Sequence, residues 1–257
     1  MGFERYLYDE NELPLDKIID DGGYAAIFRS IACVGDSLSS GEFEVKNESG
    51  VTVALKDIYE YSWGQFLGRM IGSKVYNFSA GGLTASAYVN DFAERRGCWD
   101  KDKACQCYII ALGHNDLYWA KPPVGSKEDI DFEDYNNNAK TFFGNYAKII
   151  QRYKEIQPNA RFFLITMPYG EKKEEYEIPD QLAEVLYTMA EIFTNTYVID
   201  LRKYGPVHDK EFKEAFYLGG HLNAAGYIMS AKQIASYMDY IIRHNIKDFL
   251  DVPFIGN

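Results

Sequence analysis

Five short apolar runs recur along the 257-residue chain, and longer stretches with helical spacing separate them. Continuous apolar runs are typical of strands that are covered on both faces, and the alternation of strand and helix is the pattern of a parallel sheet with crossover helices. The predicted strands are 30–34, 75–78, 107–112, 161–166 and 196–200. We therefore predict an α/β fold, a three-layer α/β/α sandwich with one five-stranded parallel sheet.

The stretches that follow these runs supply the predicted helices. They are 58–72, 84–95, 134–156, 179–194 and 223–243. In the last of them Asn223 is the expected N-cap. Its expected apolar face consists of Tyr227, Ile228, Ile234, Tyr237, Met238 and Ile241. Because crossover connections are right-handed, this alternation predicts a doubly wound sheet with the flavodoxin-like strand order 2-1-3-4-5.

The length of the chain favours a single domain over residues 1–257. Residues 1–29 precede the first strand and are expected to form an N-terminal extension. The segment 43-FEVKNESGVTVALKD-57 has a turn-like Asn-Glu-Ser-Gly between two alternating runs, which predicts a small hairpin insertion.

The chain is acidic, with a formal net charge of −11 and a pI near 4.9. Nucleic acid and anionic membrane surfaces would be repelled, so neither is an expected partner. No window is long and apolar enough for a membrane span, and the first thirty residues carry acids where a secretory signal needs an apolar stretch. We expect a cytoplasmic protein.

The cysteines give no indication of a metal site. Cys98, Cys105 and Cys107 have the spacing C-x6-C-x-C, and Cys33 stands apart. Structural zinc sites use paired C-x2-C knuckles, and no histidine lies near enough in sequence to complete one. Cys33 and Cys107 lie inside apolar runs and are expected to be buried.

Polar, glycine-containing segments follow the first three predicted strands. They are 35-GDSLSSGE-42, 77-NFSAGGLT-84 and 113-GHND-116, and a fourth segment, 217-YLGGHLNAAGY-227, precedes the last helix. Ligands of open parallel sheets bind beyond the carboxyl ends of the strands. A nucleophilic hydroxyl, two sources of oxyanion donors and a histidine are therefore predicted to meet at one edge of the sheet.

These segments resemble the motif blocks of the SGNH or GDSL hydrolase family. The family is named for a serine, a glycine, an asparagine and a histidine in four separated blocks. The matching blocks here are 34-VGDSL-38, 77-NFSAGGLTAS-86, 112-LGHND-116 and 221-HLNAAGY-227. They occur in the family's order, and the resemblance spans residues 31 to about 240.

The resemblance implies acyl transfer to Ser37 with His221 as the general base. It further implies that the backbone N–H groups of Ser37 and Gly82 and the side-chain amide of Asn115 hold the oxyanion. Neither a metal nor another cofactor is implied. The implied partner is a small-molecule ester.

One position departs from the family pattern. The last block of the family reads Asp-x-x-His, and Leu218 stands where the aspartate is expected. Three alternatives remain open. A carbonyl of the Leu218-Gly219-Gly220 stretch could accept the Nδ1 proton of His221. A carboxylate from elsewhere, with Glu42, Glu44 and Asp209 as candidates, could do so instead. In the third alternative catalysis is lost and the pocket only binds a ligand.

Aromatic residues next to the third block bear on the substrate. His114 is expected in the pocket wall, and Tyr118 and Trp119 in 117-LYWAKPP-123 are candidates for stacking on a sugar or an acyl chain. No long apolar stretch suggests a lipase lid. These features favour a small-acyl or carbohydrate ester, such as an acylated sugar.

A metallophosphoesterase is a less favoured alternative. The segments 35-GD-36 and 113-GHND-116 have a superficial likeness to the motifs of that class. However, the class needs an Asp-x-His pair ahead of Gly-Asp and the order Gly-Asn-His, and this chain has neither.

Overall fold

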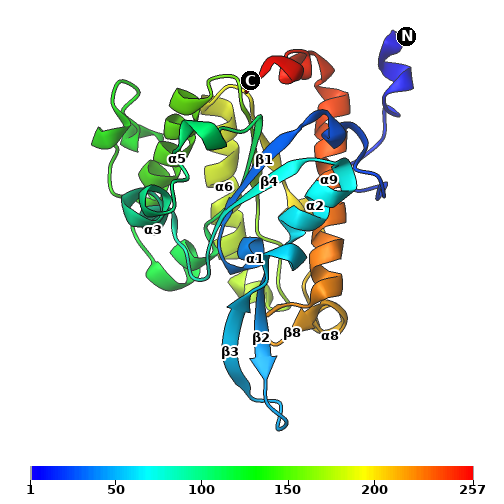
Figure 1. Ribbon diagram of the computed structural model, residues 1–257, viewed down its shortest axis with the longest axis vertical. Helices are drawn as coiled ribbons and strands as arrows, with labels where there is room; N and C mark the ends of the chain where they lie inside the picture. Colours follow the sequence, from blue (N-terminus) through cyan, green and yellow to red (C-terminus); the bar gives the residue numbers. More distant parts are fainter. Residues whose placement is uncertain (1, 257) are drawn as a thin grey trace.

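A computed structural model describes residues 2–256 and contains one five-stranded, all-parallel sheet (Figure 1). Its strands are β1 (Ser30–Gly35), β4 (Lys74–Ser79), β5 (Cys107–Ala111), β6 (Arg161–Ile165) and β7 (Thr196–Ile199). They lie in the order β4-β1-β5-β6-β7. Numbered within this sheet alone, that order is 2-1-3-4-5. The predicted strands and their doubly wound order are confirmed.

Helices cover both faces of the sheet. On one side lie α5 (Phe142–Ile156) and α6 (Glu177–Ile192), and on the other lie α2 (Trp63–Ile71) and α9 (Ala224–His244). Successive side chains of a strand point to opposite faces. In β1, accordingly, Val34 packs in the core beneath α5 and α6, whereas Cys33 packs in the core beneath α2 and α9. These two apolar cores make the predicted three-layer sandwich.

The predicted helix 134–156 begins later than expected, at Phe142. The Asp134 side chain accepts a hydrogen bond from the backbone N–H of Asn136, which fixes a 3-10 turn there. Thr141 then acts as the N-cap by accepting from the N–H of Gly144. Short polar side chains compete for backbone groups in this way, so they favour turns and caps over a helix interior.

Two other predicted helices are also interrupted. The segment 84–95 consists of α3 (Ala85–Ala87), a π-helical turn (Tyr88–Phe92) and α4 (Ala93–Arg95). The π turn buries Tyr88, Val89 and Phe92 together in the core. In the segment 58–72, a 3-10 turn (Tyr59–Tyr61) comes before α2, because Ser62 accepts from the N–H of Gln65 and caps the helix at Trp63.

The last helix, α9, starts where the sequence predicts, with Asn223 capping it through the N–H of Gly226. Its predicted apolar face is buried except for Ile228, which is 39% exposed, so the prediction is wrong for that residue. Ala235 and Ile242 lie further along the same helical stripe and are buried. Ile228 follows the buried Tyr227 and so lies about 100° further around the helix, at the margin of the buried face.

Two hairpins lie at the edge where the parallel strands end. The first follows α1 (Ser37–Ser40) and pairs β2 (Glu42–Lys46) with β3 (Thr52–Asp57); it projects from the body of the molecule (Figure 1). The second pairs β8 (Tyr217–Leu218) with β9 (His221–Leu222), follows α8 (Lys210–Phe216) and contacts the first through β2 and β9.

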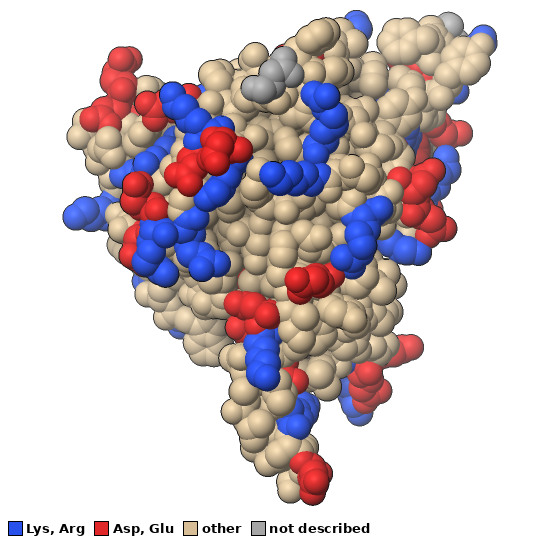
Figure 2. All heavy atoms as spheres, viewed as in Figure 1, with Lys and Arg blue, Asp and Glu red and all other residues tan. Residues whose placement is uncertain are grey.

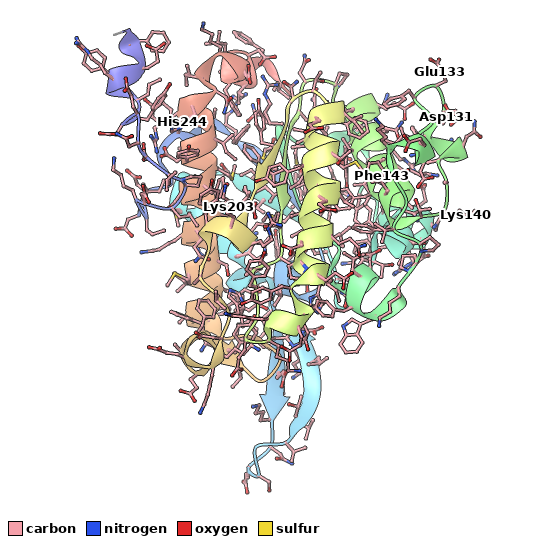
Figure 3. The ribbon with its side chains drawn as sticks, turned by 180° about the vertical axis from the view of Figure 1, so that it is seen from behind. Asp131, Glu133, Lys140, Phe143, Lys203 and His244 are labelled. Atoms are coloured by element: carbon pink, nitrogen blue, oxygen red, sulfur yellow. The ribbon has the colours of Figure 1, made fainter. Side chains whose placement is uncertain are left out.

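The remaining surfaces of the molecule lie away from this edge. The view from behind shows α6 over the sheet, and Asp131, Glu133 and Lys140 lie on the long loop that leads into α5 (Figure 3). On the face drawn in Figure 2, acidic and basic side chains are interspersed. Within residues 2–256, no helix combines the length and apolar character that crossing a membrane requires.

Candidate active site

Ser37 is the first residue of α1 and lies partly buried directly after β1. Asp36 caps this short helix, its Oδ1 accepting from the N–H of Leu38 at 3.1 Å. Gly35 makes the sharp turn possible, because a Cβ at that position would lie 2.1 Å from the Ser39 hydroxyl. The local sequence Gly-Asp-Ser therefore sets the serine at the N-terminus of a short helix, where Asp36 accepts from the N–H groups of Leu38, Ser39 and Ser40.

Asn115 connects the loops that follow the three strands β1, β4 and β5. Its Nδ2 lies 3.2 Å from the carbonyl oxygen of Leu83 and 3.3 Å from Asp36 Oδ2. Gly82, next to Leu83, has a φ of +70°, a left-handed conformation that favours glycine. Asn115 thus links the loop that carries Ser37 with the loop that carries Gly82.

Two buried carboxyl groups support this arrangement. Burial raises the pKa of Asp36 to about 7, although the N–H of Leu38 and the charge of His221 oppose that rise. Asp116 accepts from the N–H of Ala85 at 3.0 Å, and burial raises its pKa to about 6. Both groups therefore titrate close to neutral pH.

His221 lies on β9, partly buried, between two glutamates of β2. Its Nδ1 is 3.4 Å from Glu44 Oε1, and its Nε2 is 3.0 Å from Glu42 Oε1. Leu218, in the position of the missing aspartate, is 38% exposed. Two of the three candidate acids are thus at the ring. The third, Asp209, instead caps α8 by accepting from the N–H of Phe212.

Glu44 is held firmly in place. The Thr52 hydroxyl donates to its Oε2 at 2.6 Å, and the N–H of Gly220 donates to its Oε1. These hydrogen bonds, with that of Thr52 the largest cause, lower the pKa of the Glu44 carboxyl. Gly219 has a φ of +81°, and a Cβ there would overlap the carboxylate at 2.0 Å. The glycine pair therefore makes room for Glu44.

The carbonyl alternative has no counterpart among the hydrogen bonds of residues 2–256, because the partner of His221 Nδ1 is Glu44. In the same set, no hydrogen bond joins the Ser37 hydroxyl to His221. The nitrogen that would face the serine contacts Glu42 instead.

The three candidate substrate contacts differ in exposure. His114 has its Nδ1 3.4 Å from the sulfur of Met167 and its ring 4.8 Å from that of Tyr118, and burial lowers its pKa. Tyr118 is partly buried, whereas Trp119 is 75% exposed. The His114 residue is itself exposed although it also lines a cavity, and Trp119 is a free aromatic surface.

A mostly apolar cavity of about 120 Å³ lies beyond the ends of the central strands. Asp36 and Leu38 line it from the first block, His114 from the third, and Leu222 from next to His221. The wall is completed by side chains from the other layers, among them Ile234 of α9. Sequence reasoning missed this cavity because its lining comes from segments far apart in the chain, and no local pattern marks them.

Within residues 2–256, no three or more His, Cys, Asp or Glu residues are grouped as metal ligands. The four cysteines are buried and unpaired, including the predicted Cys33 and Cys107. Burial raises the pKa of Cys98 to about 11 and that of Cys105 to about 12.

With this geometry in place, comparison with known proteins identifies the class. Residues 33–228 match the model of the GDSL-like lipase/acylhydrolase family. Because this match covers most of the chain, the protein belongs to that family and is a hydrolase that acts on esters. A search of curated protein sequences found no match.

Solved structures share the fold at low sequence identity. A family two carbohydrate esterase from Clostridium thermocellum, in complex with cellohexaose, is 14% identical with a TM-score of 0.57, covering 86% of this chain and 65% of its own. The psychrotrophic esterase EstA from Pseudoalteromonas sp. is 15% identical with a TM-score of 0.56, covering 83% and 98%. A protein from Lactobacillus plantarum is 16% identical with a TM-score of 0.60, covering 83% and 97%.

The buried Asp36 predicts how stability depends on pH. Its folded-state pKa of about 7 lies above the ordinary 3.8, so its contribution to stability is complete below about pH 4 and is lost as the pH rises through 7. The free energy of unfolding, measured with urea from pH 4 to 8, should fall less steeply for Asp36→Asn than for the wild type. Glu48→Gln, on the exposed hairpin turn, should keep the wild-type slope. A slope in Asp36→Asn equal to that of the wild type would contradict this assignment.

Proposed function

We propose that this protein is a serine esterase that cleaves a small-acyl or carbohydrate ester through an acyl-enzyme intermediate on Ser37. The observation that carries the proposal is the contact between His221 Nδ1 and Glu44 Oε1 at the edge that also holds Ser37. A carboxylate on Nδ1 fixes the imidazole tautomer and stabilises the imidazolium that forms during acyl transfer. The acid absent at Leu218 is therefore supplied from β2.

The reaction takes place in two halves. The Ser37 hydroxyl attacks the ester carbonyl while His221 Nε2 takes its proton. Collapse of the tetrahedral intermediate breaks the bond to the leaving alcohol, and His221 returns the proton to that alcohol. Water then attacks the acyl-enzyme while His221 takes its proton. Collapse of this second intermediate releases the carboxylic acid, and His221 returns the proton to Ser37.

The oxyanion is held by the backbone N–H groups of Ser37 and Gly82 and by the amide of Asn115. The helix start at Ser37 leaves its N–H available, and at Gly82 no atom lies within 4 Å of the position a Cβ would take. Asn115 is held by its 3.2 Å bond to the Leu83 carbonyl, and it would exchange the longer 3.3 Å contact with Asp36 for the oxyanion.

Two features favour a small or sugar-linked ester. The cavity of about 120 Å³ is comparable to cavities that hold a benzene-sized group, so it suits a short acyl chain. The exposed Trp119 offers a face on which a sugar ring could stack. Carbohydrate esterases are also among the similar folds.

Loss of the nucleophile or the base tests the mechanism. Hydrolysis of p-nitrophenyl acetate should fall by at least about 10³ in Ser37→Ala and in His221→Ala, and by about 10²–10³ in Asn115→Ala, because an oxyanion donor contributes that much. Folding of each variant is checked by circular dichroism. Equal rates in all variants and the parent would rule out the proposed site, and a protein that binds sugar esters without hydrolysing them would be the inactive alternative.

Glu44 should affect catalysis more than affinity. In Glu44→Gln the side chain keeps its shape but loses the charge that stabilises the imidazolium, so kcat should fall by up to about 10⁴ while KM changes little. Asp209→Asn is the matched control, because asparagine can still cap α8 and the residue lies away from the ring. A similar loss in both variants would show that neither carboxylate has a specific role at His221.

The cavity should limit the acyl chain. Values of kcat/KM for p-nitrophenyl esters are expected to be highest for acyl chains from acetyl to about hexanoyl and to fall for longer chains. Ser230→Leu, which adds bulk to the cavity wall, should lower the butyryl rate several-fold relative to the acetyl rate. Ala225→Leu places the same side chain at an exposed position of α9 and should leave the ratio unchanged. Preferential hydrolysis of long-chain esters would contradict this assignment.

A further inference from the structure

The Glu42 carboxylate lies at the reactive side of His221 and has no role in the proposed mechanism. Its Oε1 is 3.0 Å from His221 Nε2, and the residue is 9% exposed. A Cβ at Gly81 would lie 2.4 Å from its Oε2, so the carboxylate also touches the glycine loop that carries Gly82. It therefore lies between His221 and the loop that carries the proposed oxyanion donor Gly82.

Glu42 is held differently from Glu44. Whereas Glu44 receives hydrogen bonds from Thr52 and Gly220, the Glu42 carboxylate has only an ion-pair contact with His221 Nε2, and no hydrogen bond to it is found within residues 2–256. The backbone of Glu42 is fixed, because the Tyr227 hydroxyl donates to its carbonyl oxygen at 2.7 Å. The carboxylate can thus change partners while its backbone stays in place.

The contact with Glu42 is incompatible with catalysis. Both nitrogens of His221 face carboxylate oxygens, and a neutral imidazole has only one N–H. Both contacts are favourable only when a further proton is present, either on the ring or on Glu42. In either case Nε2 cannot accept the proton of Ser37. An ionised Glu42 would also repel the developing oxyanion.

The charged surroundings are acidic on several sides. Besides the two glutamates of β2, the acidic Asp36 at the start of α1 feels the charge of His221, which works to lower its pKa. His114, after β5, also feels this charge, which adds to the lowering of its pKa. Asp57 of β3 faces Glu42, and burial raises the pKa of Glu42 while His221 opposes the rise. A group that donates a hydrogen bond to Glu42 would relieve this crowding of negative charge.

We propose that Glu42 is a specificity-determining residue that selects esters with a free hydroxyl group beside the scissile bond. This inference rests on the proposed esterase function. The substrate hydroxyl donates to the Glu42 carboxylate, which turns away from His221 and leaves Nε2 free to accept the proton of Ser37. An ester without such a donor, p-nitrophenyl acetate included, leaves Glu42 on Nε2 for more of the time and is hydrolysed more slowly, and an ester with a neighbouring carboxylate is repelled.

A matched pair of substrates tests the selection. The first is a methyl glucoside with one acetyl group and free hydroxyls, and the second is the same acetyl ester with those hydroxyls methylated. The wild type should prefer the first in kcat/KM by at least about tenfold. Glu42→Gln should reduce that preference at least several-fold, because the amide is a weaker acceptor and no longer holds an imidazolium at Nε2. Glu48→Gln, on the same hairpin, should leave it unchanged.

Two outcomes for Glu42→Gln would contradict the inference. If Glu42→Gln changes both rates by the same factor, or leaves the preference intact, Glu42 does not select substrates and the inference fails. A higher rate on the methylated ester in Glu42→Gln would support the release of Nε2 directly.

A second readout needs no catalysis. In Ser37→Ala, the NMR signals of the His221 ring, identified with a His221→Gln variant, should shift when methyl glucoside is added, and the methylated sugar should have no effect. The shift should be absent in Ser37→Ala combined with Glu42→Gln. A sugar-dependent and Glu42-dependent shift without hydrolysis of any ester would show that Glu42 recognises the hydroxyl group, and it would overturn the esterase function. Hydrolysis without a Glu42-dependent shift or preference would support the esterase function and overturn the role of Glu42 in selecting substrates.

Discussion

The parallel direction of the five strands is the constraint on which the rest of the structure depends. Because all carboxyl ends meet at one edge, the loops after β1, β4 and β5 must lie side by side. This placement lets Asn115 reach both Leu83 and Asp36. The two apolar cores hold the sheet rigid from either side, so the polar loops need only short segments to bring their groups together.

The β2–β3 hairpin gives this common edge its particular chemistry. It supplies both carboxylates at His221, and Thr52 on its second strand fixes the orientation of Glu44. The Gly219–Gly220 turn accepts that carboxylate only because it has no side chains. In the proposed mechanism, an acid on a separate hairpin replaces one that would otherwise lie three residues before the histidine, and the same hairpin adds Glu42 at the opposite nitrogen.

Local sequence predicted the fold better than it predicted helix boundaries. The strands and their order followed from apolar runs that are buried on both faces. The start of α5 did not, because Asp134 and Thr141 form local hydrogen bonds that outweigh a continuous helical pattern. The exposure of Ile228 depended on how far the buried face of α9 reaches around the helix, which periodicity alone does not decide.

The sequence by itself determined the sheet and the placement of Ser37, Gly82, Asn115 and His221 at one edge, because strand direction and block order are local and sequential properties. Only the tertiary structure decided which acid meets the histidine. Glu44 lies 177 residues from His221, and its approach depends on how one hairpin packs against another. The cavity behind the site was likewise decided by packing, because its wall is assembled from segments of every layer.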